Sequence, residues 1–216
     1  MQLLNSILDL VFPPVCLACG KNGEYLCTEC ISAMPSAERE SADWIHPMLD
    51  YRHKPLKDAL WQLKYSGKRQ LAEVFAEILY PRMLEELADR KIMENFGEPL
   101  LLPIPLSRKR RRERGFNQAE LICRKLVELD REENFTLETG ALARPKDSEH
   151  QARIEERKKR LENIVGAFSV KNPEKISGRN IILIDDITTT GATLSEAKKV
   201  LREAGARKVV AFTVAH

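Results

Sequence analysis

The chain has 216 residues, 43% hydrophobic and 31% charged, a composition typical of a globular protein with one sizeable core. Its formal net charge is +3, from 35 basic and 32 acidic side chains, which is too small to indicate a polyanionic partner by itself. No apolar run approaches the roughly 18 residues of a membrane span, and no secretory signal is recognisable. We therefore expect no membrane span and a cytoplasmic location.

The first 14 residues predict a short amphipathic helix. Its apolar side would carry Leu3, Leu4, Ile7, Leu8 and Val11. We expect this helix to pack against the main domain, with a membrane-surface helix as the alternative.

Four of the five cysteines form two Cys-x-x-Cys pairs, Cys16 with Cys19 and Cys27 with Cys30. Four thiolates at this spacing can close a tetrahedral Zn²⁺ site with no open position, which indicates a structural metal. So short a segment cannot bury a core, so the metal would supply the folding energy, on the order of 10 kcal/mol. An iron–sulfur cluster is the weaker alternative. We assign residues 1–35 to an N-terminal helix and zinc module.

Residues 36–98 are predicted to form a helical linker region. The first helix covers residues 55–64 and places Trp61 on its apolar face together with the leucines. A longer helix follows over residues 70–94 and contains Pro81.

Residues 99–216 alternate strands and helices, which predicts an α/β domain with a parallel sheet flanked by helices. Residues 99–106 read as a buried strand, and the next helix has Asn117 as its N-cap. Later strands are expected within residues 166–170, 181–185 and 208–216, and Gly205 marks the end of the last helix.

The stretch IILIDDITTTGATL, residues 181–194, carries the clearest chemistry. Ligands of an open parallel sheet bind beyond the carboxyl ends of its strands, where Asp185 and Asp186 are expected. The small residues that follow lead into a helix N-terminus, which attracts phosphate. The two acids would repel phosphate but suit hydroxyl groups or Mg²⁺. A ribose 5-phosphate fits both halves, whereas the Gly-Lys-Thr or Gly-Lys-Ser run of a P-loop is absent from the sequence.

Residues 181–193 resemble the thirteen-residue motif with which type I phosphoribosyltransferases bind 5-phosphoribosyl 1-pyrophosphate (PRPP). The resemblance implies that Asp185 and Asp186 contact the ribose, with Mg²⁺ accompanying PRPP. It also implies a 5-phosphate loop made of Thr188, Thr189, Thr190, Gly191, Ala192 and Thr193. The alternative is a capped helix after a strand, with incidental aspartates.

Six of the seven residues from Arg108 to Arg114 are basic, and Gly115 follows them. The type I fold has a pyrophosphate-binding loop after its first core strand, which would place Arg114, Gly115 and Phe116 at that loop. The family also has a hood loop that closes over the reacting centre. From that loop the resemblance implies Gln151, Arg157 and Arg160.

The same basic run has a second interpretation as a nucleic-acid interface through Arg108, Arg110, Arg111 and Arg112. A solvated helix or loop face is the alternative. Among the few aromatic residues, Phe116 and Tyr65 are the plausible candidates for stacking on bases. We therefore expect stacking to add little to the binding of single-stranded DNA.

A four-cysteine module ahead of a PRPP motif, together with PIPL, RGFNQ and a helix ending in Ala-Gly-Ala, resembles the ComF family over residues 13–216. Pro103-Ile104-Pro105 stands where the family usually has Pro-Val-Pro, and Glu149 and His150 replace a threonine and a proline. The resemblance implies a part in DNA uptake during natural transformation, with the uptake machinery as a partner. Two hypotheses follow: a PRPP-binding protein without turnover, or a phosphoribosyltransferase that releases pyrophosphate to an unidentified acceptor.

Overall fold

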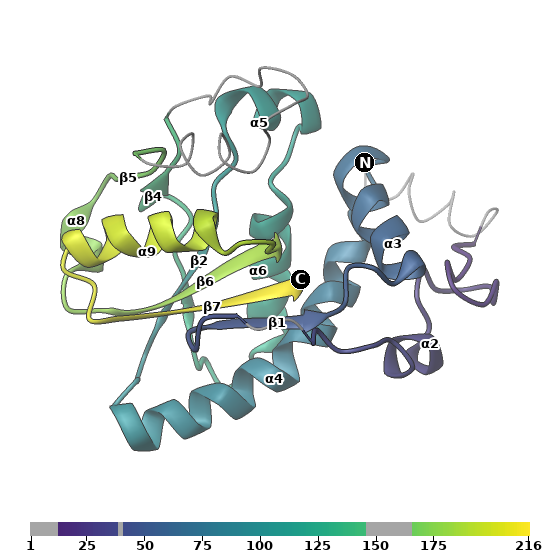
Figure 1. Ribbon diagram of the computed structural model, residues 1–216, viewed down its shortest axis with the longest axis horizontal. Helices are drawn as coiled ribbons and strands as arrows, with labels where there is room; N and C mark the ends of the chain where they lie inside the picture. The colour runs from purple at the N-terminus through teal and green to yellow at the C-terminus, as the bar shows by residue number, and fades with distance from the viewer. Residues whose placement is uncertain (1–12, 39–40, 146–165) are drawn as a thin grey trace.

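The computed structural model describes residues 13–38, 41–145 and 166–216 (Figure 1). The apolar positions of the predicted N-terminal helix lie outside the described residues. So do Gln151, Arg157 and Arg160, and their predicted roles stay predictions.

Five parallel strands form the main sheet, in the order β1-β7-β6-β2-β3. Their bounds are Ile45–Leu49 for β1, Leu100–Pro103 for β2, Thr136–Leu137 for β3, Asn180–Ile187 for β6 and Lys208–Ala215 for β7. The predicted α/β fold with a parallel sheet is confirmed. The central strands β6, β7 and β2 are apolar nearly throughout, as strands buried on both faces must be.

Helices cover both faces of this sheet (Figure 1). Ile182 and Ile184 of β6 belong to the hydrophobic cluster that contains α3 (Lys54–Tyr65), α4 (Leu71–Glu94) and α6 (Gln118–Leu129). Ile181 and Leu183 belong to the cluster of α9 (Ala192–Glu203) on the other face. Successive side chains of a strand point to opposite faces, so one strand feeds both cores.

Local signals in the sequence define the helix ends. The side chain of Asn117 accepts a hydrogen bond from the Ala119 amide at 3.1 Å and caps α6, as predicted. Gly205, with φ of +90°, follows the end of α9. The described residues also form five short elements: α2 (Thr28–Ser32), α5 (Arg108–Arg114), α8 (Pro173–Ile176) and the antiparallel pair β4 (Leu142–Ala143) and β5 (Ser169–Val170).

Three regions differ from the sequence-based expectations. Residues 45–49 form β1 at the sheet edge, although only helices were predicted between residues 36 and 98. Its sequence, IHPML, contains a proline and does not alternate apolar and polar residues, so periodicity does not reveal it. The basic run expected as a loop is the helix α5. Trp61, placed on the apolar face of its helix, is instead exposed on α3.

The cysteine-containing segment packs onto the main body of the protein. Tyr25, Leu26 and Met34 belong to the same buried cluster as α3, α4 and one face of the sheet. The domain boundaries at residues 35 and 98 stay predictions, but the hydrophobic core crosses both of them. No helix within the described residues is long and apolar enough to cross a membrane.

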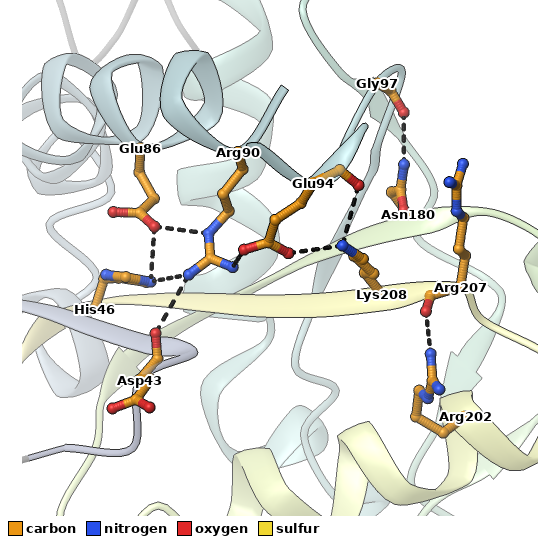
Figure 2. A network of polar contacts seen from close by, with 10 residues as sticks. All are labelled: Asp43, His46, Glu86, Arg90, Glu94, Gly97, Asn180, Arg202, Arg207 and Lys208. Atoms are coloured by element: carbon orange, nitrogen blue, oxygen red, sulfur yellow. Dashed lines mark hydrogen bonds and ion pairs between the residues drawn. The ribbon is translucent and has the colours of Figure 1, made fainter. Parts of the chain in front are cut away.

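A polar network on α4 ties this helix to the sheet (Figure 2). Arg90, with its side chain 15% exposed, donates to Glu86 at 2.6 Å, to Glu94 at 3.1 Å and to the Asp43 carbonyl at 3.3 Å. Glu94 in turn pairs with Lys208 of β7 at 2.9 Å. The network therefore joins the long helix to the segment before β1 and to the start of β7.

We expect Arg90→Ala to lower the free energy of unfolding by about 2 kcal/mol, because it leaves the half-buried carboxylate of Glu86 without its main partner. Arg82→Ala is the matched control, since Arg82 pairs with Glu85 on the exposed side of the same helix. That control should cost less than about 0.5 kcal/mol. Urea unfolding of both variants measures the difference, and equal losses would contradict the structural role of the network.

Candidate PRPP site and zinc centre

The two acids of the PRPP motif lie at the carboxyl end of strand β6 and face opposite sides of the sheet. Asp186 follows Ile182 and Ile184 on the α3 side, where its Oδ2 lies 3.0 Å from the Lys64 Nζ. The side chains are 10% and 16% exposed, respectively. A close ion pair with so little water around it holds the Asp186 carboxylate in place.

Asp185 lies on the α9 side and has a different environment. Its Oδ1 accepts the Asp186 backbone N–H at 2.9 Å. Burial, and secondly the charge of Asp186, raise the pKa of Asp185 to about 7, although Lys64 and Arg144 act in the opposite direction. Asp185 is thus a carboxyl group that exchanges its proton near neutral pH, and any cation bound beside it would favour the charged form.

The loop after β6 is anchored to the end of β7. The buried Thr188 donates its amide to the Ala215 carbonyl at 2.9 Å, and the His216 ring lies 2.8 Å from the Thr189 carbonyl. Thr189 and Thr190 are exposed, and the three residues after them are half-buried: Gly191, Ala192 and Thr193. The predicted phosphate loop is therefore a fixed turn whose small residues remain accessible.

Gly191 is required at this turn for two reasons. Its φ is +71°, a left-handed conformation that disfavours other residues. A Cβ at this position would also lie 3.1 Å from the Ile45 Cδ1 of β1. From Gly191 the chain enters α9, whose first amides have no partner within the helix and can donate to an anion.

The basic segment after β2 divides into paired and unpaired arginines. Arg111 pairs with Glu120 of α6 at 3.0 Å, and Arg114 donates to the Tyr65 hydroxyl at 3.2 Å. By contrast, Arg108, Arg110 and Arg112 are exposed and form no ion pair with another described residue. The four arginines predicted for nucleic acid are therefore not equivalent, because Arg111 already has a structural partner.

Gly115 and Phe116 form the turn between α5 and α6. Gly115 has φ of +75° and caps α5, as expected of a residue at a tight turn. Phe116 is buried, with the Arg69 guanidinium 4.8 Å from its ring centroid. Its side chain therefore supports the turn from below and is not available for stacking on a base.

Lys64 is the site residue that the sequence analysis missed. It lies in the last turn of α3, far from the motif in sequence, and its contact with Asp186 depends on how α3 packs beyond the ends of the strands (Figure 1). Its neighbour Tyr65 reaches Arg114, so the end of α3 brings the acid pair and the basic segment together. A lysine in the last turn of a helix is common, and nothing in the sequence distinguishes this one.

The four cysteines Cys16, Cys19, Cys27 and Cys30 form a separate centre, in which all the sulfur atoms lie within 4.8 Å of one another. The Sγ of Cys27 is 3.8 Å from that of Cys16 and 3.7 Å from that of Cys19. Zn–S bonds of about 2.3 Å in a tetrahedron require sulfurs about 3.8 Å apart, so the geometry fits the ion.

The backbone around the cysteines favours thiolates. Burial raises the pKa of the Cys16 thiol, but the amides of Cys19, Cys27 and Ala18 together lower it to about 6. The remaining thiols cannot all ionise side by side: contact with Cys27, then with Cys19, raises the pKa of Cys30 to about 12. A divalent cation removes that conflict, because it balances the charge of several thiolates at once.

A hollow of about 740 Å³ lies at the amino ends of the strands, between the end of α4 and the loop before β3. Asn180 and Arg207 line it at the starts of β6 and β7 (Figure 2). Because the strands are parallel, their amino ends lie away from Asp185 and Asp186, which are at the carboxyl end of β6. The hollow is therefore not the PRPP site.

Comparison with known proteins agrees with both centres. Residues 7–41 match the double zinc ribbon domain family, and residues 112–216 match the phosphoribosyl transferase domain family. Competence protein ComFC of Streptococcus pneumoniae is 32% identical over 200 residues, which cover 89% of this chain and 81% of that protein. The chain belongs to the ComF family.

Other relatives of this ComF protein carry different names. DNA utilization protein YhgH of Escherichia coli K12 is 27% identical over 93% of this chain and 82% of its own length. Competence protein F of Haemophilus influenzae is 26% identical over 94% and 84%, respectively. A hypoxanthine phosphoribosyltransferase of Trypanosoma cruzi superposes with a TM-score of 0.38 at 11% identity over 67% of this chain and 66% of that one. That likeness is too weak to add to the family assignment.

The family match and the sulfur geometry together identify a structural zinc site, so purified ComF protein should contain about one zinc per chain. Cys27→Ser should lose the metal and lower the melting temperature, because Tyr25 and Leu26 beside it are part of the main core. Cys123→Ala is the control, since that thiol is buried on α6 away from the cluster, and it should keep its zinc. A folded segment 13–35 in zinc-free protein would contradict the assignment; metal analysis and limited proteolysis measure both.

The raised pKa of Asp185 predicts a dependence of stability on pH. An acid with a higher pKa in the folded state binds more protons there than in the unfolded state, so stability falls as pH rises from about 4 to about 7. Asp185→Asn has no such group. Its gain in melting temperature over the parent should be larger at pH 8 than at pH 5, and an equal gain at both would show that Asp185 keeps an ordinary pKa.

Proposed function

We propose that this ComF protein binds PRPP together with Mg²⁺ at the carboxyl end of β6 and acts in DNA uptake. The observation that carries the proposal is the acid pair at the end of a buried central strand, followed by a fixed loop of small residues at a helix N-terminus. An anion fits that loop, while the acids suit hydroxyl groups and a divalent cation.

In this proposal each part of PRPP has its own partner. The 5-phosphate would accept hydrogen bonds from the loop of residues 188–193, and the ribose hydroxyls would donate to Asp185 and Asp186. Arg114 and the turn at Gly115 would hold the pyrophosphate. Mg²⁺, when bound beside the two acids, would neutralise charge between them and the pyrophosphate.

Lys64 adds a condition for binding. Its ion pair occupies one oxygen of Asp186, at 3.0 Å. A ribose hydroxyl or a metal that uses the same oxygen has to compete with this ammonium group. Lys64 would then be free to turn toward the negatively charged pyrophosphate, so the site exchanges one ion pair for another.

A phosphoribosyltransferase with turnover is the second candidate, and Asp185 favours it. A carboxyl group with a pKa of about 7 can accept a proton from an attacking nucleophile at neutral pH. Asp185 is thus a candidate general base in a complex where Mg²⁺ does not contact it, because a bound cation would lower its pKa. The bond from the anomeric carbon to pyrophosphate would break as the bond to the acceptor forms.

Two observations support the proposed role in DNA uptake. The relatives include competence proteins and proteins named for DNA utilization. In this chain, Arg108, Arg110 and Arg112 are exposed on α5 without ion-pair partners among the described residues, as a contact with nucleic-acid phosphates requires. The free thiols of the zinc centre are compatible with the cytoplasmic location we expect.

The double substitution Asp185→Asn with Asp186→Asn should abolish Mg²⁺-dependent PRPP binding, with a loss of about 100-fold or more, because two charged contacts disappear. Asp58→Asn is the control, since this carboxylate lies on α3 and pairs with Lys54 instead. Isothermal titration with PRPP measures binding, and circular dichroism checks the fold. A double variant that binds PRPP as tightly as the parent would refute the proposed site.

A pyrophosphate-release assay with candidate acceptors then distinguishes the two functions. Release that depends on Asp185 favours the enzyme. Tight PRPP binding without release, across nucleobases, amines and ammonia, favours a binding protein.

A further inference from the structure

Two large aromatic side chains lie exposed on α3, where the core does not need them. Trp61 is 58% exposed and Tyr65 is 60% exposed. The inner face of the same helix is complete without them, because Leu56, Leu60 and Leu63 are fully buried. Trp61 and Tyr65 are four residues apart and therefore project from one side of the helix.

The two rings form a defined pair. Their centroids are 5.6 Å apart and their planes are inclined by 44°. The Arg114 guanidinium lies 5.0 Å from the Tyr65 ring centroid and donates to its hydroxyl at 3.2 Å. A cation–π contact and a hydrogen bond therefore both hold Tyr65 in place beside Trp61.

Arg114 is also the last residue of α5, so this aromatic pair adjoins the other arginines of that helix, of which Arg108, Arg110 and Arg112 pair with no described residue. Arg108, Arg110 and Arg112 are exposed, and Glu113 is the one acid within α5. The helix is about 10 Å long at 1.5 Å per residue, so its cations lie within a nucleotide or two of the rings. Aromatic rings beside unpaired cations suit a ligand with stacking faces and a negatively charged backbone.

We propose that Trp61 and Tyr65 form a base-stacking platform for single-stranded nucleic acid, whose phosphates contact Arg108, Arg110 and Arg112 of α5. The proposal rests on the proposed function in DNA uptake and gives it a specific surface. It differs from the expectation that stacking adds little, which considered Phe116 and Tyr65 but not Trp61. Phe116 is buried, whereas Trp61 is exposed. A duplex does not offer its base faces, so the platform selects single strands.

Binding of a labelled oligothymidylate, measured by fluorescence anisotropy, tests the platform. Trp61→Ala with Tyr65→Ala should weaken binding about ten-fold or more, as the loss of stacked bases predicts. Trp61→Phe should restore most of the loss at that position, because a ring remains. Ile92→Ala is the matched control, since Ile92 is 85% exposed on α4, and it should bind like the parent.

An abasic oligonucleotide of equal length separates stacking from phosphate contact. It should bind the parent and the double alanine variant equally, because it has no bases to stack. Changing Arg108, Arg110 and Arg112 to Gln should instead weaken both oligonucleotides and flatten the salt dependence of binding. In a Trp44→Phe background, oligothymidylate should quench the fluorescence of Trp61, whereas the abasic strand should not.

The outcomes are distinct. Unchanged oligothymidylate binding by the double alanine variant overturns the platform, although DNA binding through the arginines stands. A parent that binds neither oligonucleotide overturns both the platform and the DNA-binding part of the proposed function. PRPP binding by Trp61→Ala should equal that of the parent, which shows that the fold and the PRPP site are intact.

Discussion

The alternation of side chains along β6 sends two adjacent carboxyl groups to opposite faces of a buried sheet. Asp186 is buried and Asp185 is partly exposed, so the two carboxyl groups are stabilised in different ways. Asp186 pairs with Lys64 of α3, whereas the pKa of Asp185 is raised to about 7 by burial and by the charge of Asp186. The carboxyl end of β6 thus combines groups from both faces of the sheet.

The last turn of α3 is where these parts meet. Lys64 contacts Asp186 of the acid pair, and Tyr65 contacts Arg114, so neighbouring residues touch the two halves of the proposed PRPP site. Behind this helix, Tyr25 and Leu26 pack in the same core as its leucines. The zinc centre thus supports the helix that carries Lys64, and through it the proposed PRPP site. The proposed aromatic platform and the proposed PRPP site both include residues of this last turn of α3.

The features best predicted from the sequence are those that depend on a few neighbouring residues. The acid pair, the cap at Asn117 and the glycine turn at Gly191 each follow from rules that act over a few residues. Contacts between distant segments were not predictable in this way. Lys64 and Trp61 lie on the same helix, and the hydrophobic pattern of that helix does not show which of them faces the protein. In the structure Lys64 contacts Asp186 with little exposure, whereas Trp61 is exposed. The strand β1 was not predicted, because its residues are extended through pairing with β7 and their hydrophobic pattern is not that of a strand.

That pairing of β1 with β7 has a consequence for how the protein is made. Ile45 lies opposite Ala211, which is 166 positions later in the chain (211 − 45), so the edge strand is made long before its neighbour. Contacts of such long range slow folding, and a strand that waits unpaired is open to wrong partners. The phosphate loop is tied to the end of β7 through Thr188 and Ala215, and Gly191 is packed on Ile45 of β1. The proposed phosphate loop therefore takes its final shape only after β1, β6 and β7 have paired.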